Sequence, residues 1–535
     1  MKPADVDYIA LLKTLTDIGV ALSVEKDHKR LLEFILIQAK SLTNADAATL
    51  YECVEGKLLK FEIIITESLH VHAGGTSERK ITLSPLPLFK NGKPNRDMVA
   101  TTVFFTKKPI NIEDAYHNKA FDFSGTYQAD KENKYHSQSF LTVPLINHLD
   151  EVIGVLQLIN AREPGTTQII PFSELDEQIV HALSSQVAIS ITKNKLINAQ
   201  KELFDSLIQL VASAIDEKSP YTANHCRRVP VLTQMIAEAA CQADYGPLKE
   251  FTLTTEEIYE VEVAAWLHDC GKIAIPEYVV DKATKLETIF DRIHLVDTRF
   301  EVLKRDARIA YLTEPGKKDE EALKNTLSQL EEDRQFIHKC NIGKEFISQE
   351  DILRINRIAS QRWEEPSGAL APLLSEEEIL NLAIPRGTLT LQEREVINSH
   401  VSITAKLLNA LPYPKNLKRV PEFAAGHHEK LDGTGYPQGL SGETLPMQSR
   451  MIAIADIFEA LTASDRPYKK AMPLSQCLKI LGEMKLSGHI DPNLFDIFIE
   501  EKIYLRYARQ YLDEKLIDEF DIKTIPGYCP VKNKN

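Results

Sequence analysis

The sequence predicts a multidomain chain in which an α+β domain is followed by an all-α domain, the two being joined by a long helix. Three observations predict this arrangement. The chain has 535 residues, more than the ~100–200 residues typical of one domain. Its first part alternates helix-like and strand-like patterns, whereas the pattern from Ser219 onward is almost entirely helical. Between these parts, residues 172–218 contain neither glycine nor proline, as a continuous helix requires.

Two helices and five strands are expected in the first domain. Apolar residues recur at helical spacing over residues 7–24 and 27–43, and an aspartate that can cap a helix leads each segment. The sequence NHLDE separates the last two strand-like runs and predicts a hairpin. The strand-like runs are short and rich in apolar residues, and they cover residues 47–54, 58–66, 108–114, 138–147 and 151–160.

The segment at residues 172–218 is much longer than the ~11–12 residues of an average helix. Ile189, Leu196, Leu203 and Leu210 recur in it at heptad spacing, which is typical of a coiled-coil seam. The seam predicts a homodimer joined through this helix. A helix packed on its own domains is the alternative, and it stays open because polar residues occupy several intervening seam positions.

A highly charged helical stretch runs from about Thr288 to Arg386 and contains few residues with an evident chemical role. Within it, EEALKNTLSQLEEDRQFIHK has the pattern of a solvated amphipathic helix. A solvated structural extension is the expected role of these helices, and a lid over the site or a surface that binds a partner are the alternatives.

The composition excludes some classes of function. Hydrophobic residues make up 43% and charged residues 26% of the chain, both ordinary for a folded soluble protein. The 63 basic and 77 acidic residues give a net charge of −14, which argues against binding of long nucleic acid by bulk electrostatics. A small anionic ligand in a locally basic pocket remains compatible with this charge.

Targeting signals are not expected. The stretch MKPADVDYIALLKTL has neither a basic n-region nor an uninterrupted apolar core, and no window approaches the ~18 consecutive apolar residues of a membrane span. The seven cysteines are scattered and form no C-x-x-C pair, which indicates reduced thiols. The sequence thus predicts a cytoplasmic protein without a membrane span.

Seven histidine and aspartate side chains stand out because each lies in a helical, partly apolar segment, where an ionisable group is costly unless paired or bound to a cation. Five imidazoles and two carboxylates suit borderline metals such as iron, manganese or zinc. The seven are His225, His268, Asp269, His400, His427, His428 and Asp456. The histidines expected to be surface or core residues are His28, His70, His72, His117, His136, His148, His181, His294 and His338.

The number of candidates indicates two ions rather than one. A mononuclear catalytic site uses about three protein ligands, whereas a carboxylate shared between ions ~3.5–4 Å apart is the arrangement of dinuclear hydrolases. The stretch GHHEKLDGTGYP, which contains the paired histidines, lacks the GxxxxGK[ST] pattern and is not expected to be a phosphate-binding loop.

Three motifs in this region closely resemble the HD-GYP subgroup of HD-superfamily phosphohydrolases, the phosphodiesterases of cyclic di-GMP. They are HDCGK, HHEKLDGTGYPQGLSGETLP and DIFEALTASDRPYKKA, in the order that the family has. The resemblance runs from about Asp205 to the neighbourhood of Phe498, and residues 288–386 look like an insertion. It implies an HD-GYP helical domain over residues 205–535, preceded by a connecting signalling helix over residues 172–218.

By resemblance, the seven candidates divide between two metals, with Asp269 as the bridge. The expected ligands of one metal are His225, His268, Asp269 and Asp456. The expected ligands of the other are His400, His427 and His428. Some family members hold a third metal through a glutamate four residues before the first histidine. Tyr221 occupies that position here, so two divalent ions, iron or manganese, are expected.

The same resemblance assigns residues to the substrate. Lys272, one turn after the His–Asp pair, is similar to the family lysine that faces the substrate phosphate, so Asp269 and Lys272 are the expected catalytic residues. Tyr436, Arg466 and Lys469 resemble residues that line the nucleotide pocket.

The implied activity is hydrolysis of cyclic di-GMP to linear pGpG, with GMP as a further product left open. Two alternatives remain open as well. One is a catalytically weak receptor that binds a cyclic dinucleotide, and the other is a phosphodiesterase of cyclic GMP-AMP, because the sequence does not distinguish guanine from adenine.

The stretch SQSFLTVPLINHLDEVIGVLQLINA resembles the second half of a GAF domain, especially those of cyclic-nucleotide phosphodiesterases, and implies a GAF-like sensor domain over residues 1–195. A small-molecule ligand that regulates the catalytic domain is expected there, and a dimerisation module without a ligand is the alternative. Ala161 replaces the lysine of the family's N-K…F-x-x-x-D-E pattern. The other positions of that pattern match at Asn160, Phe172, Asp176 and Glu177.

Overall fold

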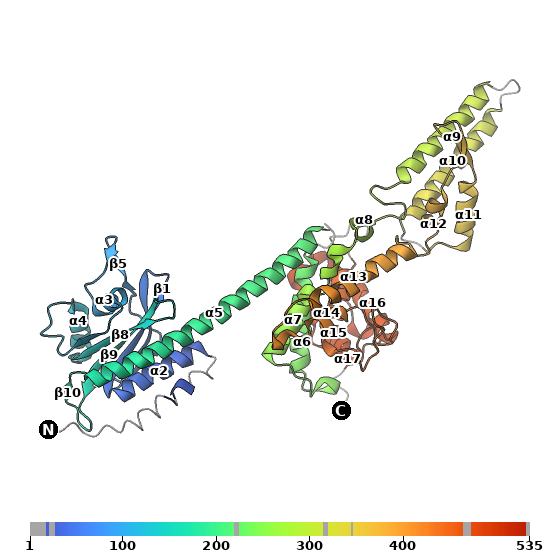
Figure 1. Cartoon of the computed structure of the whole chain (residues 1–535). Coiled ribbons are helices and arrows are strands. Elements are labelled where there is room, and N and C mark those ends of the chain that lie inside the picture. Colours follow the sequence, from blue (N-terminus) through green and yellow to red (C-terminus); the bar gives the residue numbers. More distant parts are fainter. Residues whose placement is uncertain are drawn as a thin grey trace. The chain divides into compact units, whose positions relative to one another are not determined.

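The computed structural model describes residues 16, 18–20, 27–218, 224–313, 319–343, 346–463 and 472–530. The chain divides into two compact units, Met1–Leu203 and Phe204–Asn535. Figure 1 shows the elements of both units. The predicted helix over residues 7–24 lies almost wholly outside the described residues.

An antiparallel sheet forms the centre of the first unit. Its strands are β1 (Ala45–Val54), β2 (Leu58–Thr66), β3 (Val71–Gly74), β4 (Leu86–Pro87), β7 (Ile110–Ile112), β8 (Phe140–Ile146), β9 (Val152–Arg162) and β10 (Ile169–Ile170). The main path is β3-β2-β1-β9-β8-β7, with β4 paired to β2 and β10 to β9. A separate hairpin pairs β5 (Phe89–Lys90) with β6 (Lys93–Pro94). The predicted hairpin around NHLDE is confirmed, because β8 and β9 pair directly on either side of it.

Helices cover both faces of this sheet. They are α2 (His28–Leu42), α3 (Val99–Thr106), α4 (Ser124–Asn133) and the first part of α5 (Glu174–Lys218). Leu50 and Leu156 share a core with α2 and α5, which run beside each other in Figure 1. Tyr51 and Val155, one position away, pack with α3 instead. This alternation follows from the two-residue period of a strand.

Helix α5 confirms the predicted long helix and is 45 residues long. Its apolar residues join the core of the first unit as far as Ile191 and that of the second unit from Ile208 onward. The heptad residues are exposed instead, by 59% at Ile189, 58% at Leu196, 62% at Leu203 and 64% at Leu210. Although α5 is long, no helix in the described part of the chain is apolar over enough of its length to cross a membrane.

The second unit is mostly helical, as expected. Its main helices are α6 (His225–Gln242), α7 (Thr255–Leu267), α8 (Glu277–Val280), α13 (Leu391–Asn409), α14 (Val420–Ala425), α15 (Met447–Thr462), α16 (Leu474–Leu486), α17 (Pro492–Glu500) and α18 (Ile503–Tyr511). Short 3-10 helices lie at η1 (Gly246–Leu248), η2 (Cys270–Ala274), η3 (Lys415–Leu417), η4 (Glu514–Leu516) and η5 (Ile522–Thr524). Helix α6 packs against α7 and α15, and α14 packs against α7 and α13. One apolar core runs through α6, α7 and α13 to α18.

The charged stretch at residues 288–386 has a core of its own, which includes Phe300, Ile337 and Ile355. The amphipathic helix predicted there buries its apolar face in this core. A two-stranded hairpin also departs from the all-α expectation, because Pro366 and Gly368 form a tight turn between its strands. The elements are α9 (Ile293–Thr313), α10 (Glu320–Asn341), α11 (Gln349–Ala359), β11 (Arg362–Glu364), β12 (Leu370–Pro372) and α12 (Glu376–Leu382).

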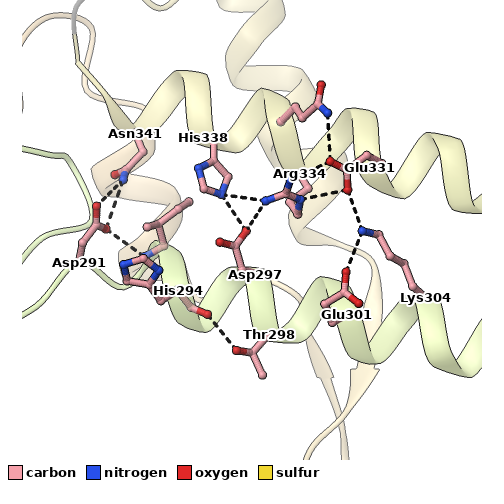
Figure 2. A network of polar contacts seen from close by, with 12 residues as sticks. Asp291, His294, Asp297, Thr298, Glu301, Lys304, Glu331, Arg334, His338 and Asn341 are labelled. Carbon is pink, nitrogen blue, oxygen red and sulfur yellow. Dashed lines mark hydrogen bonds and ion pairs between the residues drawn. The ribbon is translucent and has the colours of Figure 1, made fainter.

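A polar network joins α9 to α10 (Figure 2). Asp297 on α9 accepts hydrogen bonds from Arg334, at 3.1 Å, and from the ring of His338, at 2.7 Å. Lys304 on α9 donates to Glu331 on α10, at 2.7 Å. Such partly exposed contacts contribute little each to stability, and they lie beside the apolar core that α9 and α10 share.

Candidate metal centre

The second unit brings all seven candidate ligands together, mostly at helix ends. His225 is the first residue of α6, His268 and Asp269 lie between α7 and η2, and His427 and His428 follow α14. His400 and Asp456 lie within α13 and α15. Capping boxes start α7 and α13, and so fix where these two helices begin.

Three overlapping groups of potential metal ligands result, and within each the ligand atoms lie within 4.8 Å of one another. The first group contains His225, His268 and Asp456. The second contains His400, His427 and His428. The third contains His268, Asp269 and His427, and so connects the other two. Such sets of imidazole and carboxylate groups could hold divalent ions.

Hydrogen bonds to Nδ1 orient four of the imidazoles. The ring of His268 donates to the backbone oxygen of Ala265 at 2.7 Å, an oxygen left without a helical partner at the end of α7. The rings of His400 and His427 likewise bond the carbonyl three residues earlier, at 2.6 and 2.5 Å. The ring of His225 instead contacts the carboxylate of Glu459 at 2.5 Å. In each case Nδ1 is occupied and Nε2 is left for another partner.

Among the residues that the structure describes, the Nε2 atoms of these four rings are buried and have no hydrogen-bond partner, as is also true of Asp269 Oδ1. Buried polar atoms nearly always have a binding partner. The convergence of these particular atoms therefore indicates a partner that accepts several lone pairs. Divalent cations fit this requirement, because each lone pair can coordinate an ion.

Asp269 lies between the two groups of rings. Its Oδ2 is 3.4 Å from Nε2 of His225 and 3.3 Å from Nε2 of His268. Its Oδ1 is 3.3 Å from Nε2 of His400 and 4.0 Å from Nε2 of His427. Each carboxylate oxygen thus faces a different group, as a carboxylate shared by two ions would.

The electrostatics favour the protonation states that metal ions need. Burial lowers the pKa of His428 to about 4, and burial together with the neighbouring imidazoles holds the pKa of His427 well below its usual range. Burial alone would raise the pKa of Asp269, but the charges of Lys272 and His268 outweigh it and hold that pKa well below its usual range. Near neutral pH, His427 and His428 are therefore neutral and Asp269 is ionised.

His225 is the exception. Burial alone would lower its pKa, but the carboxylates of Glu459, Asp269 and Asp456 outweigh this and raise it well above the usual range. In the metal-free protein this ring therefore carries a proton that a cation would displace.

Two of the four residues expected to contact the substrate lie in the described part of the chain. The ammonium of Lys272 lies 2.5 Å from Asp269 Oδ2, and its pKa is raised because the nearby carboxylates outweigh burial. The ring of Tyr436 stacks on that of His428, with centroids 4.9 Å apart. Arg466 and Lys469 lie outside the described residues, as does Tyr221.

Two features that the sequence reasoning missed fix the loop and the helix around the site. Buried Glu429 accepts a hydrogen bond from the backbone N–H of Gln438, at 2.7 Å, and so folds the loop with Tyr436 back on itself. Thr404 on α13 accepts from the N–H of Gly271 at 2.9 Å and donates to the oxygen of His268 at 3.1 Å. Both residues lie within one helical turn of a predicted ligand, a spacing that could have identified them.

None of the nine histidines expected to be non-ligands occurs in a metal-like group within the described ranges. Three of them pair with a single acid: His72 with Glu33 at 3.1 Å, His117 with Asp114 at 2.8 Å, and His338 with Asp297 at 2.7 Å. The side chain of His28 lies outside the described part of the chain.

Comparison with known proteins gives two family matches. The GAF domain family matches residues 27–191, and the HD domain family matches residues 371–494. The second match begins after His225, His268 and Asp269 and includes the other four candidate ligands.

Relatives in Vibrio cholerae include a 3'3'-cGAMP-specific phosphodiesterase 3, which is 25% identical over 376 residues, or 66% of this chain. A 3'3'-cGAMP-specific phosphodiesterase 1 is 45% identical over 92 residues, or 17% of this chain. A probable cyclic di-GMP phosphodiesterase is 34% identical over 143 residues, or 25% of this chain. The matches span 56%, 20% and 32% of these relatives' own lengths.

These matches bear out the two resemblances at the level of the GAF and HD domain families. The chain contains a GAF domain and, C-terminal to it, a domain of the HD family.

Proposed function

We propose that this chain is a metal-dependent phosphodiesterase that hydrolyses cyclic di-GMP to linear pGpG. The observation that carries the proposal is the convergence on the carboxylate of Asp269 of four buried Nε2 atoms that have no hydrogen-bond partner in the described part of the chain. The names of the relatives, which are cyclic dinucleotide phosphodiesterases, support the choice of substrate class. A receptor that only binds the dinucleotide would have no use for seven converging ligands.

The proposed centre holds two divalent ions, most simply iron or manganese. His225, His268 and Asp456 would hold the first ion, and His400, His427 and His428 the second. Asp269 would bridge them, in agreement with the way its two oxygens face the two groups.

The cations, when bound, supply Lewis acidity that lowers the pKa of water and offsets the charge of a phosphate. Asp269 contributes an ionised carboxylate between the groups, since its pKa is held low. Lys272 keeps its proton and places a positive charge next to this carboxylate. At this position it can stabilise the negative charge that builds on the phosphate oxygens of a substrate. Tyr436, held against His428, offers an aromatic face to a base or ribose.

Cyclic GMP-AMP is the second candidate substrate, because two of the relatives are named as phosphodiesterases specific for it. The test incubates the full-length, manganese-loaded protein with each dinucleotide and separates the products by chromatography. Consumption of cyclic di-GMP with release of pGpG is expected. Faster consumption of cyclic GMP-AMP would favour the second candidate. Binding of either without any hydrolysis would contradict the proposed activity and favour a receptor.

Regulation by the GAF domain forms part of the proposal. A cavity of about 630 Å³ opens on the sheet of the first unit and is lined by residues that include Tyr51, Phe61, Tyr135 and Gln157. Its size matches that of small-molecule sites. A small organic ligand bound there would regulate the catalytic domain, and a GAF domain that serves only in dimerisation is the alternative.

A homodimer formed through α5 is the proposed assembly. The exposed heptad leucines would bury their apolar surface against a second copy, at roughly 1.5–3 kcal/mol for each fully buried leucine. Leu196→Glu should therefore weaken the dimer, and light scattering should show a shift toward the monomer mass. Leu353→Glu is the matched control, because Leu353 is 69% exposed but lies on α11. An unchanged mass for Leu196→Glu would contradict the seam.

A further inference from the structure

We infer that the two ion sites differ in affinity and that Glu459 is the positioning residue that makes the site of His225, His268 and Asp456 the tighter one. The inference rests on the proposed two-metal centre but not on its substrate. It predicts that the protein loads its metals in order, with this site filled first.

Glu459 lies directly behind His225. Its Oε2 is 2.5 Å from Nδ1 of that ring, and only 2% of its side chain is exposed. Its Oε1 lies 3.4 Å from the guanidinium of Arg228, one turn further along α6. Since Glu459 follows Asp456 by three residues on α15, one face of this helix supplies both a candidate ligand and the group that orients another.

The other oriented rings have weaker partners. His268, His400 and His427 each bond a neutral backbone carbonyl through Nδ1. A carboxylate at this position fixes the ring orientation as a carbonyl does, and it also makes the imidazole a stronger donor to a metal. His225 is thus the one oriented ligand among these four that is backed by a formal negative charge.

The two groups also differ in the number of carboxylates near them, and this difference again favours the first group. Both groups face Asp269, but the first also contains the carboxylate of Asp456 and has that of Glu459 behind it. Two cations lie on the same side, Arg228 at 3.4 Å from Glu459 and Lys272 at 2.5 Å from Asp269 Oδ2, but neither offers a lone pair to an ion, whereas Asp456 does. The second consists of the imidazoles of His400, His427 and His428. Attraction of a divalent cation grows with each nearby anion in a buried site, so the first site should bind more tightly.

The test is a titration of chelator-treated, full-length protein with Mn²⁺, in which the free ion is followed by electron paramagnetic resonance. The wild-type protein is expected to bind two ions in two separate steps. Glu459→Gln keeps an acceptor of the same size but removes the charge, and it should weaken only the tighter step by about 10–100-fold. Glu459→Asp, which keeps the charge on a shorter side chain, should lose less affinity.

Two variants serve as controls. Glu260→Gln alters another buried glutamate of the second unit, which accepts from the backbone N–H of Arg419 at 2.7 Å, and should leave both steps unchanged. His400→Ala should remove the weaker step and retain the tighter one. If Glu459→Gln does not fold, the wild-type and His400→Ala titrations decide the order of loading and Glu459→Asp decides the role of the carboxylate.

The inference is overturned if the wild-type protein binds both ions with one affinity, if His400→Ala loses the tighter ion, or if Glu459→Gln matches the wild type. Two-step binding in a protein that hydrolyses neither dinucleotide would support the inference while contradicting the proposed activity. Hydrolysis with a single binding step would do the reverse.

Discussion

Replacing Asp269 by asparagine is expected to abolish metal binding and turnover together. The substitution keeps the size of the side chain but removes the one carboxylate whose two oxygens face the two groups of rings. It also removes the negative charge that lies 2.5 Å from the largely buried ammonium of Lys272. The rate should fall by at least on the order of 10²–10³-fold, measured as hydrolysis of cyclic di-GMP, and elemental analysis should show that the ions are lost in parallel.

Asp333→Asn is the matched control for this substitution. Asp333 is equally buried but lies in the core of the insertion, where it pairs with Arg354 at 3.0 Å. Its replacement should lower the stability of the insertion and leave the metal content unchanged. Normal turnover in Asp269→Asn would contradict the dinuclear centre.

Replacing Gly271 by alanine should disturb both the fold and the second ion site. A Cβ at this position would lie 2.0 Å from the backbone oxygen of His400 and 2.7 Å from the backbone nitrogen of Thr404. Neither atom can move alone, so α13 would have to shift and carry His400 with it. Overpacking of this kind costs about 1–3 kcal/mol, which denaturation followed by circular dichroism would detect.

Gly442→Ala provides the comparison within the same unit. The nearest atom to a Cβ there is the Cδ2 atom of Leu431 at 3.6 Å, an ordinary van der Waals contact. This variant should unfold like the wild type and retain both ions. A Gly271→Ala protein with wild-type stability and a full second site would show that α13 tolerates the displacement.

The fold was predictable for those elements that a single sequence pattern determines. Strand alternation and the NHLDE turn gave the β8–β9 hairpin, and the absence of glycine and proline gave α5. The hairpin at β11 and β12 was missed because Trp363 and its neighbours form a strand of only three residues. The apolar face of α10 was predicted but its partners were not, because Leu330 and Ile337 pack against residues from other segments of the insertion.

The convergence of the seven candidate side chains was predictable because chemistry restricts which residues can bind a metal, and the motifs preserve their order. The orientation of these side chains was not predictable, because it depends on contacts between segments that are distant in the sequence. Glu459 meets His225 across 234 positions of the sequence, and Thr404 meets Gly271 across 133. Periodicity within one segment carries no information about such pairs.

Metal analysis of the anaerobically purified wild-type protein tests the central claim most directly. The claim is that seven side chains form one centre for two ions bridged by Asp269, without the glutamate that would support a third, because Tyr221 stands in its place. Elemental analysis should approach two ions per chain. Three ions per chain, or a protein that binds none when supplied with iron or manganese, would contradict the account.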